Sequence, residues 1–163
     1  MEVNSGGIIL SVTEVKVHPN YRNFNNDIAI LKLSKSLEFS NCIKAIALAA
    51  QIPRQGADVV TSGWGRLRNG GATPNILQFN TLKVISNAEC RRQIGNVPTS
   101  ILCLSHTVGN GVCNGDSGGP AVYDNQLVGV TNFVIGGCGS RAPDGYANVV
   151  FFKNWILNNT DLK

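Results

Sequence analysis

Short β-rich segments recur along most of this chain and limit the folds that are open to it. Gly, Asn, Asp and Pro residues, which favour turns, separate these segments. Beyond residue 58 the segments are Val59–Thr61, Leu77–Ile85, Ile101–Leu104, Ala121–Tyr123, Leu127–Thr131 and Tyr146–Val150. Many short strands at such spacing indicate an all-β fold, either an antiparallel barrel or a sandwich.

The first third of the chain has the same β character. Ile8–Val17 alternates apolar and polar residues but changes phase near Thr13–Glu14, which predicts a strand with a β-bulge. Ile28–Leu33 is a short apolar run and predicts a strand buried on both faces. Ile43–Ala50 predicts a crossing segment, and Pro53–Asp58 marks a boundary.

Two segments carry helical signals. Ser86-Asn87-Ala88-Glu89 has the pattern of a capping box and predicts a short helix that carries Cys90. Phe152, Trp155 and Ile156 lie at helical spacing, so about the last dozen residues predict one amphipathic helix.

Composition excludes several classes of function. The chain of 163 residues has the size of about one domain, and 43% hydrophobic residues suffice for a packed core. The net charge is +4, but the basic residues are scattered and form no stripe that would bind nucleic acid. No segment approaches the roughly 20 apolar residues of a membrane span. We therefore expect neither nucleic acid nor a membrane as a partner.

The cysteine pattern points to an oxidising compartment. None of the five cysteines has CxxC spacing and the chain has only two histidines, so we predict no metal site. Four cysteines lie in the second half and indicate two disulfides, which leaves Cys42 over. Met1–Gly7 has neither the basic nor the apolar region of a secretion signal.

The sharpest chemical signal is the run Gly115-Asp116-Ser117-Gly118-Gly119-Pro120. A Ser-Gly-Gly sequence alone is most simply a turn, because glycine lets the backbone bend tightly. The run also fits the G-x-S-x-G nucleophile elbow, which requires a helix after the serine and then Asp and His. Here a strand-like segment follows and both histidines lie upstream, so the elbow interpretation fails.

A second arrangement of the same chemistry has His, Asp and Ser in that chain order. Asp27 lies at the mouth of the predicted strand Ile28–Leu33, far upstream of Ser117. By itself Asp27 predicts only a turn or the start of a strand. Together with the glycine-flanked serine, it predicts the carboxylate that orients a catalytic base.

These motifs resemble those of the chymotrypsin/trypsin-like serine endopeptidases. The resemblance covers residues 6–160, and its motifs are Val17-His18-Pro19-Asn20-Tyr21, Asn26-Asp27-Ile28-Ala29, Ser62-Gly63-Trp64-Gly65, Cys113-Asn114-Gly115-Asp116-Ser117-Gly118-Gly119-Pro120 and Pro143-Asp144-Gly145-Tyr146. It implies two Greek-key β-barrels and a C-terminal helix. We expect residues 1–54 to be a remnant of the first barrel with the crossover. Residues 55–163 would be the second barrel with the helix.

The resemblance also assigns roles to single residues. Ser117 corresponds to the nucleophile and Asp27 to the carboxylate that orients the base. The backbone N–H groups of Gly115 and Ser117 correspond to the oxyanion hole, which stabilises the charge that develops on the substrate carbonyl. Asp116 resembles the residue that receives the freed N-terminus when a zymogen is activated.

Disulfides are implied in the same way. Cys90 is expected to pair with Cys103, and Cys113 with Cys138. Cys42 has no evident mate, so it is either a free buried thiol or paired with a group outside this chain.

The chain departs from the family pattern in two places. The Thr-Ala-Ala-His-Cys segment that carries the family's general base has no match, and neither has the Ile-Val-Gly-Gly activation start. His18 matches an ordinary His-Pro turn, and we predict a surface position for His106. The chain alone is therefore predicted to be inactive.

The predicted specificity pocket is also unusual. Its floor is Gly111, where trypsins have Asp, and Val112 and Val134 would narrow it. This favours a small or medium aliphatic P1 side chain, as in the elastases. Asp144 on the back wall leaves a basic or mixed preference open. Because a buried unpaired carboxylate is costly, we expect Asp144 to be solvated or hydrogen-bonded.

We therefore predict a secreted, monomeric serine endopeptidase of elastase/chymotrypsin-like type without a cofactor. Its partners would be polypeptide substrates and protein protease inhibitors. One alternative is a non-catalytic protease homologue that acts as a binding module, although the intact Ser117 motif argues against it. The other is a truncated fragment without function, because half a barrel leaves strand edges unpaired.

Overall fold

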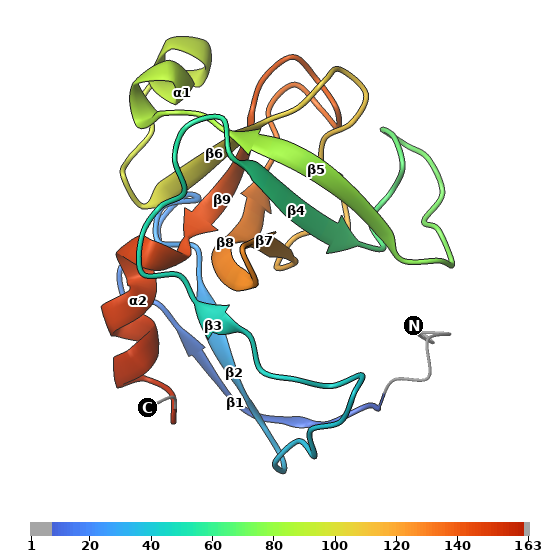
Figure 1. Ribbon diagram of the computed structural model, residues 1–163, viewed down its shortest axis with the longest axis vertical. Helices are drawn as coiled ribbons and strands as arrows, with labels where there is room; N and C mark the ends of the chain where they lie inside the picture. The colour runs from blue at the N-terminus through green and yellow to red at the C-terminus, as the bar shows by residue number, and fades with distance from the viewer. Residues whose placement is uncertain (1–7, 162–163) are drawn as a thin grey trace.

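Six antiparallel strands form a closed barrel in the computed structural model, which describes residues 8–161 (Figure 1). The sequence observations on Met1–Gly7 lie outside the described residues. In order around the barrel the strands are β4 (Asp58–Gly63), β5 (Gln78–Val84), β6 (Ile101–Ser105), β9 (Asp144–Asn148), β8 (Gln126–Phe133) and β7 (Pro120–Tyr123), which returns to β4. The predicted all-β fold and the six strands are confirmed.

Alternation of the side chains builds the barrel core. In β4 the side chains of Val59 and Thr61 are buried while those of their neighbours face outward, as the two-residue period of a strand requires. Leu82, Leu104 and Tyr146 join Val59 in the main apolar cluster. The core therefore lies inside the closed sheet, and the loops between strands carry the candidate site.

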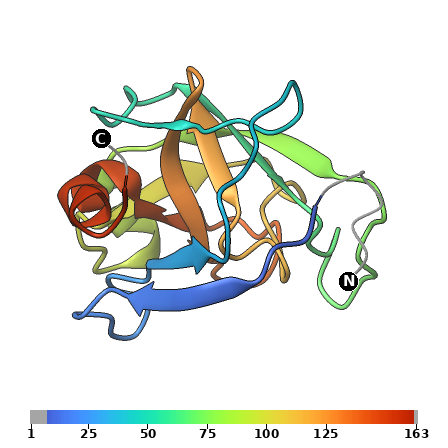
Figure 2. The same cartoon turned by 90° about the horizontal axis from the view of Figure 1, so that it is seen from below.

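A separate two-stranded ribbon precedes the barrel (Figure 2). It pairs β1 (Val12–Val17) with β2 (Ala29–Leu33), and its register shifts between Val12 and Glu14, which confirms the predicted bulge. The predicted burial of β2 on both faces was wrong, because four of its five residues are exposed. Among residues 8–161 no further strand pairs with this ribbon, and most of its side chains are exposed.

The crossing segment returns the chain to the barrel. Its short strand β3 (Ala47–Leu48) pairs in parallel with β8. The next residue, Ala49, is buried in the main cluster, and its N–H donates to the Leu127 carbonyl at 3.0 Å.

The helix predicted from the capping signal is confirmed as α1 (Asn87–Ile94), and it carries Cys90. The Ser86 hydroxyl accepts a hydrogen bond from the Glu89 N–H at 3.1 Å. The Glu89 carboxylate does not complete a capping box. It accepts instead from Gln93 at 2.7 Å and pairs with Arg92.

The C-terminal helix α2 (Val149–Asn158) is confirmed but begins three residues before Phe152. The Asn148 side chain caps it by accepting from the N–H groups of Val150 and Phe151. The last predicted strand, Tyr146–Val150, therefore ends at Asn148, and its final two residues belong to α2. Phe152 and Ile156 on α2 pack with Ile28, next to the ribbon, in a second cluster. No helix among residues 8–161 has the length and apolarity needed to cross a membrane.

Both implied disulfides are present. Cys90–Cys103 joins α1 to β6, and Cys113–Cys138 joins two loops at one end of the barrel. A disulfide of this loop size stabilises a fold by about 2–4 kcal/mol. Cys42 is free and exposed in the described structure, not buried.

Candidate active site

The Ser117 loop is a tight turn that leaves the serine exposed. The Asp116 N–H donates to the Cys113 carbonyl at 3.0 Å, and the Gly119 N–H donates to the Asp116 carbonyl at 2.9 Å. Gly115 and Gly118 have φ values of 101° and 80°, a conformation that favours glycine. Glycines therefore let the chain present Ser117 outward.

Strand β8 holds this loop in place. The Gly118 N–H donates to the Thr131 carbonyl, and the Thr131 N–H donates to the Gly119 carbonyl, both at 2.9 Å. The backbone N–H groups of Gly115 and Ser117 donate to no group within the described part of the chain. Two free donors beside an exposed hydroxyl can bind an oxygen that carries developing negative charge.

The Asp116 carboxylate points away from Ser117 into a neighbouring loop. Its Oδ1 accepts from the Gly65 N–H at 2.8 Å, and its Oδ2 accepts from the Cys113 N–H at 2.9 Å. A Cβ at residue 65 would lie 2.3 Å from the Asp116 Cγ, so Gly65 makes room for this carboxylate. A cavity of about 230 Å³ lies beside it, lined among others by Ser62, Leu67 and Gly111.

Asp27 lies two residues before the first residue of β2 and is half-buried. Burial raises the pKa of the Asp27 carboxyl above its ordinary value. Its loop contacts β8, because the Asn132 side-chain amide donates to the Phe24 carbonyl at 3.0 Å. The Phe24 ring also packs edge-on against Phe133, with ring centroids 6.0 Å apart.

The Asp27 loop and the Ser117 loop therefore attach to neighbouring residues of one strand. Thr131 holds the Ser117 loop, and Asn132 holds the Asp27 loop. Asn132 also has a buried side-chain oxygen that accepts no hydrogen bond among residues 8–161. Segments far apart in the sequence thus converge at β8.

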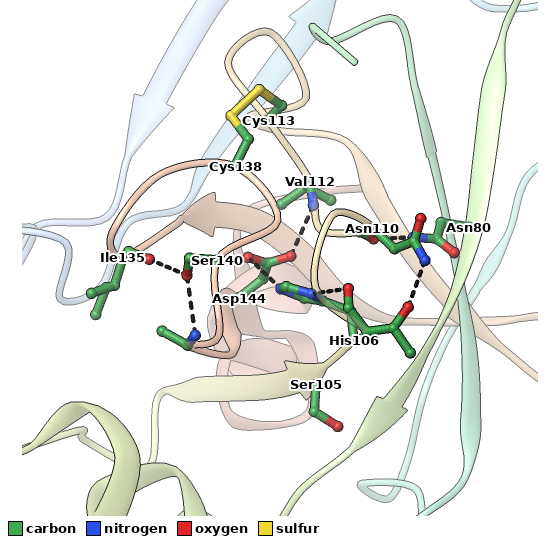
Figure 3. Close-up of polar contacts among 12 residues, drawn as sticks. Asn80, Ser105, His106, Asn110, Val112, Cys113, Ile135, Cys138, Ser140 and Asp144 are labelled. Atoms are coloured by element: carbon green, nitrogen blue, oxygen red, sulfur yellow. Dashed lines mark hydrogen bonds and ion pairs between the residues drawn. A yellow bond between two sulfur atoms is a disulfide. The ribbon is translucent and has the colours of Figure 1, made fainter. Parts of the chain in front are cut away.

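Among residues 8–161, no hydrogen bond or ion pair joins either histidine to Ser117 or Asp27. The His18 ring packs against Trp155 and Phe152 on α2, with centroids 4.9 and 5.4 Å apart, and its Nδ1 accepts from the Asn20 N–H. The predicted surface position of His106 was wrong, because its side chain is only 1% exposed. Its Nε2 lies 3.4 Å from the Asp144 Oδ1 (Figure 3).

The structure brings three of the four predicted pocket residues, Gly111, Val112 and Asp144, close together. The Asp144 Oδ2 accepts from the Val112 N–H at 2.8 Å. Val112 belongs to the main apolar cluster, and Val134 packs against that cluster. A Cβ at Gly111 would lie 2.8 Å from the Asp144 Oδ2.

Sequence reasoning missed the contact between His106 and Asp144. Its single hint was the position of His106 between Cys103 and Cys113, which no spacing rule connects to Asp144. The contact with Asp144 is the main cause that raises the pKa of His106, and burial acts in the opposite direction.

Known proteins share this architecture. Residues 1–156 match the family described as Trypsin. Serine protease SP24D of Anopheles gambiae is 47% identical over 152 residues, which cover 93% of this chain and 56% of that protein. Trypsin alpha-3 of Lucilia cuprina is 37% identical over 161 residues, which cover 95% of this chain and 97% of that protein.

A solved structure agrees with these sequence matches. Neuropsin, a serine protease expressed in the limbic system of mouse brain, superposes with a TM-score of 0.87 at 30% identity. The match covers 93% of this chain and 72% of neuropsin. The chain thus spans little more than half of SP24D but most of trypsin alpha-3. With its closed barrel, its C-terminal helix and the family match over residues 1–156, the chain belongs to the chymotrypsin/trypsin-like family of serine proteases.

Proposed function

We propose that this chain supplies the nucleophile and the orienting acid of a serine endopeptidase. The Ser117 hydroxyl attacks the carbonyl carbon of a peptide bond, the amine leaves, and water then releases the acyl group. Asp27 orients the base, and the N–H groups of Gly115 and Ser117 stabilise the oxyanion. The attachment of both loops to Thr131 and Asn132 carries this proposal.

Neither histidine of the chain is placed to act as the general base. His18 is packed against α2, and His106 is engaged with Asp144. Loss of the base histidine in a related triad costs on the order of 10⁶ in turnover, which corresponds to about 8 kcal/mol. The 163-residue chain by itself is therefore proposed to be inactive.

Asp116 is proposed to receive the freed N-terminus of the activated enzyme. Support comes from the cavity of about 230 Å³ beside its carboxylate. An α-ammonium group in this cavity would pair with Asp116 and fix the adjoining Gly115 N–H.

The proposed substrates are polypeptides with a small or medium aliphatic P1 side chain. Val112 lies in the main apolar cluster and Val134 packs against it, so a pocket bounded by these two side chains would have apolar walls. We further propose a monomer that is secreted and inhibited by protein protease inhibitors. The two disulfides support an oxidising compartment.

A chimera tests this function: the part of Anopheles gambiae SP24D outside its match to this chain is placed ahead of it, with a Thr-Ala-Ala-His-Cys segment and an Ile-Val-Gly-Gly start introduced where they are absent. Hydrolysis of peptides with P1 Ala, Val, Phe, Lys or Arg is measured for the chimera and for the 163-residue chain. We expect turnover only in the chimera, with aliphatic P1 preferred and with complete loss in Ser117→Ala. A folded chimera without turnover that depends on Ser117 would contradict the catalytic assignment, and turnover by the chain alone would contradict its inactivity.

A further inference from the structure

A buried ion pair lies directly behind Gly111, at the base of the proposed specificity pocket. The side chains of His106 and Asp144 are 1% and 2% exposed, and 3.4 Å separates Nε2 from Oδ1. His106 follows β6, whereas Asp144 is the first residue of β9. Figure 3 shows the two side chains pointing toward each other from these separate elements.

The Asp144 carboxylate makes one hydrogen bond and one ion-pair contact. Its Oδ2 accepts from the Val112 N–H at 2.8 Å, and its Oδ1 faces His106. Because the residue is almost fully buried, its charge is balanced inside the protein and not by solvent.

The surroundings of His106 favour its protonated form. Its Nδ1 lies 3.0 Å from the Thr107 carbonyl oxygen, and its Nε2 faces the Asp144 carboxylate. A neutral imidazole carries one N–H, whereas an imidazolium carries two and can donate toward both acceptors. The raised pKa of His106, caused mainly by Asp144, agrees with this geometry.

Gly111 leaves room for this pair, because a side chain at residue 111 would point directly at it. A Cβ at residue 111 would lie 2.7 Å from the His106 Nε2 and 2.8 Å from the Asp144 Oδ2. The pair therefore occupies the space that a side chain at this position would need. Since Gly111 has no side chain, a change in the charge of the pair acts on the pocket at short range.

We propose that His106 is the counter-ion that neutralises Asp144 and that its loss of a proton makes the pocket receptive to a cationic side chain. This inference rests on the proposed function, because it takes Gly111 as the pocket floor. With His106 protonated the pair has no net charge, and neutral side chains are preferred. Above the pKa of His106 the charge of Asp144 is uncompensated and attracts a cation.

Two other ionisable groups lie near the pair. Tyr146 neighbours Asp144 on β9, and burial, followed by the charge of Asp144, raises its pKa well above the ordinary value. It therefore stays neutral throughout the relevant pH range. The charge of Asp116 also raises the pKa of Tyr146, and the Asp116 carboxylate accepts hydrogen bonds from the Gly65 and Cys113 N–H groups. His106 is thus the group of this cluster whose ordinary titration range lies nearest to neutral pH.

The first measurement is an NMR titration of the histidine rings in the 163-residue chain. His18→Asn assigns the two sets of signals, since the chain has two histidines. We expect Asp144→Asn to lower the pKa of His106 by about 1–3 pH units, because an opposite charge has been removed. An unchanged titration of His106 would overturn the pairing.

The second measurement is the affinity of two pocket probes in the same chain between about pH 5.5 and pH 9. Benzamidinium, an aryl cation, should bind wild type roughly tenfold more tightly at the upper pH. Benzyl alcohol, a neutral ring, should show no such change. In His106→Gln the benzamidinium affinity should be high at every pH, and in Asp144→Asn it should be low at every pH.

The outcomes distinguish a failure of the proposed His106 role from a failure of the proposed pocket. A benzamidinium affinity that is independent of pH in wild type would overturn the role of His106 even if both variants failed to fold. If neither probe bound while Asp144→Asn still shifted the titration, the ion pair would stand. The proposed pocket, and with it the role in substrate choice, would then be overturned.

Discussion

At the scale of single residues, the candidate site contains a carboxylate whose burial lowers the stability of the folded chain. Asp27 is held half-buried, and burial raises the pKa of its carboxyl above the ordinary value. The charged form of Asp27 is therefore less favourable in the folded chain than in the unfolded chain. Residues placed for chemistry commonly cost stability in this way.

Asp27→Asn should stabilise the folded chain at pH 7. Because the folded pKa is raised, the contribution of Asp27 to stability is present below the unfolded pKa of about 3.9 and is lost as pH rises through the folded pKa. Urea unfolding should show a gain for the variant at pH 7 that disappears below about pH 3.9. Asp124→Asn, at an exposed turn, is the control, with a change within about 0.5 kcal/mol. A variant less stable than wild type at pH 7 would contradict this account.

The sequence identified single residues more readily than their partners. Ser117 and Asp27 were found because each lies in a local motif whose chemistry is explicit. His106 was misplaced on the surface because its partner, Asp144, comes from a distant strand. Local sequence patterns predict turns and helix caps, but they do not predict which buried charged side chains contact each other.

At the scale of elements, local signals were accurate where the chain determines its own structure. The Ser86 cap, the register shift near Glu14 and the barrel strands all follow from short-range rules. The burial of β2 was mispredicted because burial depends on what packs against a strand. An apolar run predicts a strand, but whether that strand is covered depends on elements elsewhere in the chain.

Ser86→Ala should destabilise α1 by about 1 kcal/mol, because the Glu89 N–H loses its acceptor. Ser86→Thr keeps a hydroxyl and serves as the matched control with a smaller loss. Hydrogen exchange of the α1 amides, together with urea unfolding, measures the effect. Equal stability of the alanine variant and wild type would contradict a role for this cap.

At the scale of the whole molecule, the two parts of the chain differ in how they are held. The barrel closes on itself and carries both disulfides, whereas the ribbon of β1 and β2 is exposed. The loop that joins the two ribbon strands is anchored by His18 and Ile28 against α2 and by Phe24 against β8. The proposed division into residues 1–54 and 55–163 follows this contrast.

Limited proteolysis of the 163-residue chain should cut first before residue 54 and leave a resistant core of residues 55–161. The exposed ribbon opens at low free-energy cost, whereas the disulfide-linked barrel does not. Mass spectrometry of the fragments locates the cuts. Cleavage that begins within β4–β9 would contradict an independently stable barrel.

We propose that Ser117 is the nucleophile and that Asp27 orients its base, with the loops of both residues attached to β8. Covalent labelling of the SP24D chimera with a fluorophosphonate tests it most directly, because an activated serine displaces fluoride and keeps the phosphonyl group. Peptide mass spectrometry should find the adduct on Ser117, with none in Ser117→Ala and much slower formation in Asp27→Asn. An adduct on another residue, or an equal rate in Asp27→Asn, would contradict the claim.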